Sequence, residues 1–217
     1  MAERSLARAT CQGLALAMIV LAVAGALAGR LGLATIAVPR SDSAAPWLLT
    51  RATGITAFVA LALDVAIGLL VSTRTSHALF AKGVAVELHR WLSPLTLALV
   101  LGHVVLLLAD GYIRFDAIDM LVPFASSYRP VAVGIGVIAA YGALVVHASF
   151  AMRKRLGTRT WRRLHYLSFV ALVGAALHGV LAGSDTGMTW IQVLYAAPLV
   201  AVTALVALRV VRAVRTR

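Results

Sequence analysis

The chain has 217 residues, of which 61% are hydrophobic and only 13% are charged. Soluble globular proteins have about 25% charged residues, so this composition excludes a soluble domain and indicates an integral membrane protein. The formal net charge of +12 is typical of membrane topology rather than nucleic-acid binding, because Lys and Arg collect on the cytoplasmic side of membrane proteins. The single cysteine, Cys11, excludes an internal disulfide.

Six apolar stretches are long enough to cross a bilayer, which takes roughly 20 residues per helix. We expect one transmembrane domain over residues 1–217, an all-α bundle of six helices with spans at about 12–29, 47–71, 84–109, 131–152, 161–182 and 188–211. The first stretch ends in a sequence that looks like a signal-peptide cleavage site, but it exceeds a typical h-region, so we interpret it as an uncleaved span. No segment remains for a soluble flavin or nucleotide domain.

The distribution of positive charge predicts the orientation of the chain. Fifteen of the 20 Lys and Arg residues lie in the N-terminal segment, the loops after the second and fourth spans, and the C-terminal tail, and five lie on the opposite side. We therefore expect a multi-pass protein of the plasma (inner) membrane with both termini in the cytoplasm. Residues 153–163 are expected to form a dense basic loop, and Pro94 is expected to kink the third span.

Two of the spans carry paired histidines. His89 and His103 lie fourteen residues apart in the third span, and His165 and His178 lie thirteen apart in the fifth. Ionisable side chains inside a membrane are costly and mark functional sites. His89 and His103 are about 21 Å apart along an ideal helix and project from nearly one face, because four turns hold about 14.4 residues. His89 can therefore face His165 at an inner depth, and His103 can face His178 at an outer depth.

The thirteen-residue spacing of His165 and His178 does not fit a straight helix. Thirteen residues rotate by about 1300°, which leaves the two side chains roughly 140° apart around the axis. We expect a local bend, a bulge, or ligation from different flanks of the helix to make up the difference.

Two histidines at each of two depths favour haem iron over other metals. Imidazole also suits copper, zinc and nickel, but zinc usually takes three or four protein ligands. A porphyrin supplies four ligands to iron, so two axial histidines complete the set, and helix bundles commonly house such groups in their cores. We expect two stacked b-type haems between the third and fifth helices, and the lack of a Cys-x-x-Cys-His motif argues against covalent attachment.

Charged side chains near the pairs are candidates for supporting roles. Haem propionates are anionic, so Arg51, Arg90 and Arg163 are candidate propionate partners, with topology and snorkelling to the headgroups as the alternative for each. Asp64 lies inside an apolar span and is a candidate proton relay, the alternatives being a protonated or hydrogen-bonded carboxyl. His147, near the end of the fourth span, is interpreted as a polar residue at a helix end, the alternative being a hydrogen bond to a propionate or a quinone.

The histidine spacings resemble a known family, the ferric reductase-like transmembrane domain. That family includes ferric reductases, NADPH oxidases and the haem-bearing membrane subunit of the bacterial methionine sulfoxide reductase system. Residues 87–93 and 155–165 are similar to the entries into its third and fifth helices. The resemblance implies that His89 and His165 ligate an inner b-type haem and that His103 and His178 ligate an outer one. It also implies electron transfer from a cytoplasmic reductant to an acceptor on the outer side.

The chain departs from the larger members of that family. Ferric reductases and NADPH oxidases carry a fused cytoplasmic flavin and nicotinamide domain, whereas this chain ends at Arg217. We therefore expect the haem-bearing membrane subunit of an oxidoreductase, which takes electrons from a separate protein, a bound flavin or a membrane quinol. The identity of the donor and of the final acceptor is left open, and no nucleic-acid partner is expected.

Two alternatives differ from this interpretation. A six-helix cytochrome b of the ascorbate-reducing kind also uses four histidines, but it distributes them over four helices instead of two. A proton-coupled small transporter or channel, using the intramembrane histidines and Asp64 without haem, leaves the matched depths of the histidines unexplained. A metal transporter would need more Asp, Glu, Cys or Met near the midplane than this chain offers.

Overall fold

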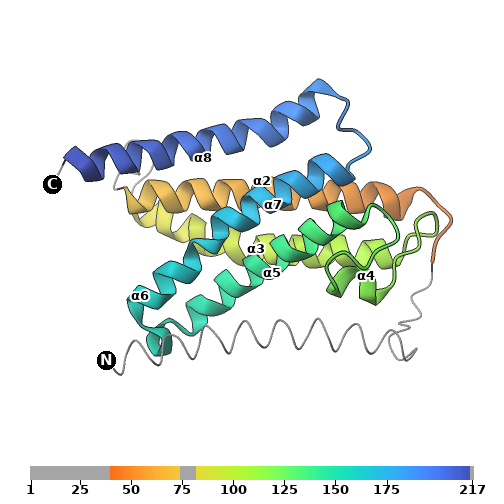
Figure 1. The fold of residues 1–217 in the computed structure, drawn as a ribbon, viewed down its shortest axis with the longest axis horizontal. Coiled ribbons are helices and arrows are strands. Elements are labelled where there is room, and N and C mark those ends of the chain that lie inside the picture. Colours follow the sequence, from red (N-terminus) through yellow and green to blue (C-terminus); the bar gives the residue numbers. More distant parts are fainter. Residues whose placement is uncertain (1–39, 74–81, 216–217) are drawn as a thin grey trace.

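The computed structural model describes residues 40–73 and 82–215, so the predicted span at 12–29 lies outside the described residues. All regular elements in the described part are helices, as expected from the sequence (Figure 1). They are α2 (Ala45–Ser72), α3 (Lys82–Leu108), α4 (Ala117–Leu121), α5 (Pro130–Ala151), α6 (Arg153–His165), α7 (Leu167–Ala182) and α8 (Thr189–Arg215).

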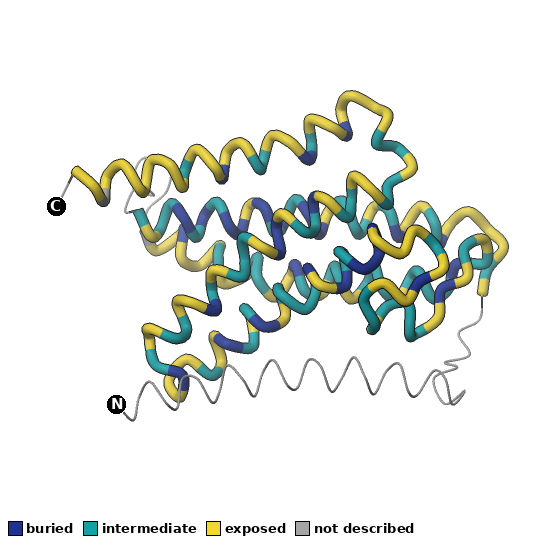
Figure 2. The backbone as a smooth tube through the Cα atoms, in the orientation of Figure 1, coloured by how far each residue is buried: buried dark blue, intermediate teal, exposed yellow. Residues whose placement is uncertain are grey.

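Five helical segments of the described part are long and apolar enough to cross a membrane, and they correspond to the second to sixth predicted spans. They are Ala45–Ser72, Gly83–Leu108, Pro130–Ala151, Arg153–Ala182 and Thr189–Arg212. Large apolar side chains cover their outer faces, where Leu101 is 64% exposed and Val200 is 68% exposed. Figure 2 shows this exposed surface along most of α8. Such a surface fits lipid, which is as apolar as the side chains themselves.

Prolines take different places in these helices. Pro46 and Pro130 lie in the first turns of α2 and α5, where the missing backbone N–H has no helical acceptor in any case. Pro94 and Pro198 lie inside α3 and α8, and both helices continue through them. Pro94 therefore does not end the helix that carries His89 and His103.

The prediction of a basic loop over residues 153–163 is wrong, because the segment is helical and forms most of α6. Leu156 and Leu164 lie on one side of α6 and are buried with Val145 of α5, while most of the basic side chains are exposed. The helix is interrupted at Gly157, whose φ of 73° suits glycine better than any other residue. The segment was predicted as a loop because most of its residues are charged or polar. It nevertheless forms an amphipathic helix whose apolar face is narrow.

The junction between α6 and α7 lies directly after His165. The N–H of Tyr166 donates to the carbonyl of Arg163 at 3.3 Å, and the N–H of Phe169 donates to the carbonyl of Tyr166 at 3.1 Å. These i to i+3 bonds are those of a tight 3₁₀ turn, which rotates the chain more per residue than an α-helix does. The break expected from the thirteen-residue spacing of His165 and His178 is therefore present, and it lies between them.

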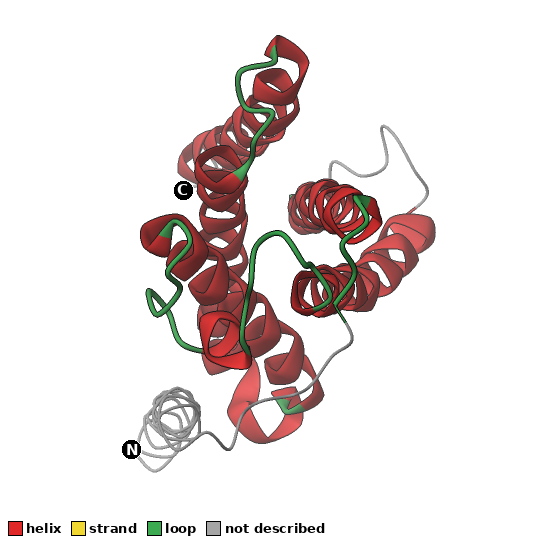
Figure 3. Ribbon diagram, turned by 90° about the vertical axis from the view of Figure 1, so that its right-hand side faces the viewer, coloured by secondary structure: helices red, strands yellow, loops and turns green. Residues whose placement is uncertain are grey.

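Four of the five described spans pack as two antiparallel pairs. α2 lies along α3, and α5 lies along α7, with far fewer contacts between α3 and α5 (Figures 1 and 3). The main apolar core joins α2, α7 and α8 through Phe58, Leu172, Ile191 and Tyr195. The histidine-bearing segments α3 and α6–α7 thus belong to different pairs and face each other across the space between the pairs.

The close approach of α5 and α7 generates a stability prediction. A Cβ at Gly174 would lie 3.0 Å from the Cβ of Ala139, whereas a Cβ at Gly83 would meet nothing within 4 Å. We expect Gly174→Leu to lower the stability of the purified protein by about 1–3 kcal/mol, because overpacking forces helices apart. Thermal unfolding in detergent should show this loss, with Gly83→Leu as the matched control. Equal melting temperatures for the two variants would contradict the packing described above.

Candidate functional site

The structure brings the four predicted histidines together as two facing pairs. The rings of His89 and His165, the inner pair, have centroids 6.0 Å apart and an interplanar angle of 80°. The rings of His103 and His178, the outer pair, have centroids 6.2 Å apart and an angle of 84°. The residues that the structure describes contain no group of three or more His, Cys, Asp or Glu side chains that could hold a metal ion. Each candidate centre therefore has two imidazoles from the protein.

The ring separations fit one metal ion held between the members of each pair. A metal–nitrogen distance of about 2.0–2.1 Å, with roughly 1 Å more from each nitrogen to its ring centre, places two opposed imidazole centroids about 6 Å apart. The separation of the two rings in each pair leaves room for one metal ion between them.

Hydrogen bonds orient three of the four rings. The Nδ1 atom of His103 lies 2.8 Å from the carbonyl oxygen of Thr50, and that of His89 lies 3.1 Å from the carbonyl oxygen of Asp64. The Nδ1 atom of His178 lies 2.8 Å from the carbonyl oxygen of Ala132. A carbonyl only accepts hydrogen bonds, so each Nδ1 carries the proton. Nε2 is left with the lone pair that binds a metal.

Glycines on α2 make room for the two histidines of α3. A Cβ at Gly54 would lie 2.8 Å from Nδ1 of His103, and a Cβ at Gly68 would lie 3.2 Å from Cε1 of His89. The two glycines are fourteen residues apart, as the two histidines are, because α2 and α3 run antiparallel in one register. Each glycine stands one turn after the carbonyl that its histidine binds.

The same arrangement recurs between α5 and α7. A Cβ at Gly136 would lie 2.6 Å from Nδ1 of His178, and the carbonyl that accepts from this ring belongs to Ala132, one turn earlier. Three of the four histidines are therefore held by a carbonyl and a glycine on a neighbouring helix. The same combination of a carbonyl and a glycine four residues later thus positions each of these three rings.

His165 is the exception among the four. Its Nδ1 atom is buried and has no hydrogen-bond partner among the described residues. Its ring lies 5.3 Å from the ring of Trp161, at an interplanar angle of 35°. His165 also lies at the break between α6 and α7, so its ring is positioned by packing rather than by a carbonyl.

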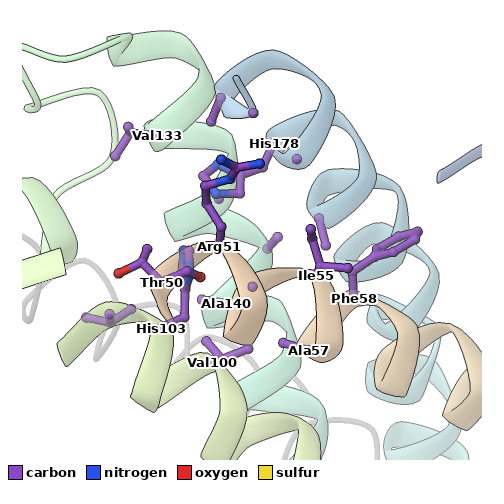
Figure 4. A pocket seen from close by; sticks show the side chains of 18 of the residues that line it. Thr50, Arg51, Ile55, Ala57, Phe58, Val100, His103, Val133, Ala140 and His178 are labelled. Carbon is purple, nitrogen blue, oxygen red and sulfur yellow. The ribbon is translucent and has the colours of Figure 1, made fainter. Parts of the chain in front are cut away.

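An apolar cavity surrounds the outer pair. It is lined from α2, α3, α5, α7 and α8, and Figure 4 shows His103 and His178 among apolar side chains that include Phe58, Val100 and Ala140. Thr96, seven residues from each histidine of α3, also lines it and is 3% exposed, and its Oγ1 has no hydrogen-bond partner in the described part of the chain. The inner pair does not line this cavity.

The three predicted arginines lie in different surroundings. Arg51 lines the outer cavity beside His178 (Figure 4). It is ion-paired with Asp185, which lies in the connection between α7 and α8. Arg90 is ion-paired with Glu87 at 3.0 Å, and its side chain is 66% exposed. Arg163 is exposed on α6. Arg51 is thus the arginine placed at the cavity itself, and Asp185 is a neighbour that sequence reasoning missed.

The remaining polar candidates lie at the inner half of the site. Asp64 is 8% exposed, and its Oδ1 lies 2.7 Å from Nδ1 of His89. His147 of α5 is exposed, and its Nδ1 lies 3.3 Å from Oγ of Ser93 on α3. Asp64 is therefore part of the surroundings of a candidate metal ligand, whereas His147 stands apart from both pairs.

The glycine contacts generate a prediction about the outer pair. Gly136→Ala should displace the ring of His178 and weaken the outer centre, because the added Cβ would overlap Nδ1. Changes in residues that orient a metal ligand typically cost about 10–100-fold in affinity. For the haem that the sequence predicts at the outer pair, we expect selective loss, measured as haem per chain after purification with limiting haem. Gly142→Ala on the same helix, where a Cβ would make ordinary contact, is the control. Full haem content in Gly136→Ala would refute the proposed role of this glycine.

Comparison with known proteins adds one match. Residues 53–176 match the family described as "Ferric reductase like transmembrane component". This range includes His89, His103 and His165 and ends two residues before His178. No significant match was found among curated proteins or among solved structures.

Proposed function

Because the chain belongs to the ferric reductase-like transmembrane family, we propose that it carries electrons across the membrane through two b-type haems. In this proposal His89 and His165 hold the inner haem, and His103 and His178 hold the outer one. The family match covers more than half of the chain and agrees with the resemblance drawn from the histidine spacings. Family membership indicates a membrane subunit of an oxidoreductase.

The observation that best supports the proposal is the geometry of the two histidine pairs. Each pair has the ring separation of two axial ligands, and three of the four rings have their Nδ1 protons bound to carbonyl oxygens. Within the described residues, neither pair belongs to a group of three or more His, Cys, Asp or Glu side chains that could hold a metal ion, as zinc sites do, and Asp64 lies at the Nδ1 side of His89. The donor set of two neutral imidazoles therefore fits haem iron better than a free metal ion.

The protein's part in this function is to bind, orient and exclude water. When bound, the two haems would supply one-electron oxidation and reduction. The carbonyls of Thr50, Asp64 and Ala132 hold three imidazoles in one tautomer. Apolar side chains such as Phe58 and Val100 keep water from the outer centre. Arg51, at the cavity, supplies a cation for a propionate and would exchange part of its pairing with Asp185 for that contact.

We assign the electron donor and the electron acceptor to opposite sides of the membrane. The exposed basic residues of α6 and the C-terminal part of α8 place positive charge at the end of the bundle nearest the inner pair, which is the cytoplasmic end by the positive-inside rule. A separate donor protein, a bound flavin or a membrane quinol would deliver electrons there. An acceptor on the opposite side would receive them near the outer pair.

Single histidine substitutions test the pairing directly. We expect His89→Ala and His165→Ala to remove the same haem, and His103→Ala and His178→Ala to remove the other, since each haem needs both axial ligands. Haem per chain, together with the reduced-minus-oxidised spectrum and potentiometric titration, identifies which haem remains. His147→Ala, outside both pairs, is the matched control and should keep both haems. Loss of different haems in His89→Ala and His165→Ala would contradict the proposed ligation.

A further inference from the structure

The Nδ1 sides of the two histidines on α3 differ in one respect. His89 and His103 each bind a backbone carbonyl of α2, but the carboxylate oxygen Oδ1 of Asp64 also lies 2.7 Å from Nδ1 of His89. At His103, the residue in the equivalent place is Thr50, fourteen positions earlier in the antiparallel register. The surroundings of the two histidines on α3 are therefore nearly the same. They differ in that a carboxylate stands beside His89, whereas the equivalent residue at His103 carries a hydroxyl.

Among the described residues, His89 is the ion-pair partner of the buried Asp64 carboxylate. Asp64 is 8% exposed, and its Oδ1 has no well-aligned hydrogen bond among the described residues. The Nδ1–H of His89 is aligned with the Asp64 carbonyl at 3.1 Å, so Oδ1 makes a close electrostatic contact at the same proton. A buried carboxylate is costly unless a positive or strongly polarised group compensates it. His89 is the group that the described structure offers.

We propose that Asp64 is a positioning residue that gives the inner haem a lower reduction potential than the outer haem. This inference rests on the function proposed above. A carboxylate at the second ring nitrogen raises the basicity of a metal-bound imidazole. A more basic ligand and a nearby negative charge both stabilise the ferric state relative to the ferrous state. Thr50 carries no charge, so His103 lacks this effect.

The consequence is a direction for electron flow. In a protein that holds both haems, the transfer of one electron between them would oxidise the iron held by His89 and His165 from ferrous to ferric and reduce the iron held by His103 and His178 from ferric to ferrous. A lower reduction potential at the inner haem would favour electron transfer from the inner haem to the outer one. A one-electron reductant at the inner side, such as a semiquinone of a flavin or quinol, would restore the ferrous inner iron. Asp64 acts on this electron transfer through its contact with His89.

The first test removes the charge and keeps the backbone contact. Asp64→Asn retains the carbonyl that His89 binds, and Asp64→Thr reproduces the residue found at the outer site. In purified protein containing both haems, the lower of the two midpoint potentials should rise while the higher one stays in place. We expect at least a tenfold change in the reduction equilibrium, about 59 mV for one electron. Both haems retained with both potentials unchanged would overturn the proposal and leave the proposed function standing.

The second test moves the carboxylate to the other site. Thr50→Asp should lower the higher potential, and the double variant Asp64→Thr with Thr50→Asp should reverse the order of the two haems. If the Asp64→Asn variant loses its inner haem, the Thr50→Asp variant tests the proposal by itself. An unchanged midpoint potential of the outer haem in Thr50→Asp would then overturn the proposal. A wild-type protein without haem would instead remove the proposed function. The failures of the two ideas are therefore distinguishable.

Discussion

The site depends on one kind of hydrogen bond, which runs from the Nδ1–H of a histidine to a backbone carbonyl of the neighbouring helix. Three of the four histidines make this bond. It needs a glycine one turn after that carbonyl, because any larger residue would overlap the ring, as at Gly54 and Gly136. The bond fixes the tautomer, and with it the nitrogen that faces the partner histidine. The register of α2 against α3 repeats this device at His103 and His89, so the packing of one helix pair sets the depth of both centres.

The packing into two helix pairs explains why the centres lie where they do. α2 supports α3, and α5 supports α7, while contacts between α3 and α5 are few. α2 supplies a carbonyl and a glycine at each histidine of α3, and α5 supplies one of each at His178 of α7. The space between the pairs is bridged at two depths by rings 6.0 and 6.2 Å apart. The proposed electron transfer would run through this space between the helix pairs, from one face of the membrane to the other.

Much of this arrangement could be predicted from the sequence, since spacing on a helix determines depth and face. The pairing of His89 with His165 and of His103 with His178 followed from that geometry, as did the need for a break between His165 and His178. The place of the break at Tyr166, the ion pair of Arg51 with Asp185 and the helical form of residues 153–163 did not. The ion pair joins segments that are distant in the sequence, the break rests on local hydrogen bonds that the spacing does not locate, and the many charges of residues 153–163 hid the apolar positions of their helix. The shared fourteen-residue spacing of Gly54 and Gly68 was visible in the sequence, but its meaning needed the antiparallel register.

The most direct test of the account is the haem content of the wild-type protein. Purified after expression with haem supplied, it should show a b-type spectrum in the dithionite-reduced minus oxidised difference. Extracted haem should approach two groups per chain, one for each histidine pair. A protein that folds and purifies without haem would contradict the account. It would favour a transporter or channel that uses the intramembrane histidines and Asp64 for protons.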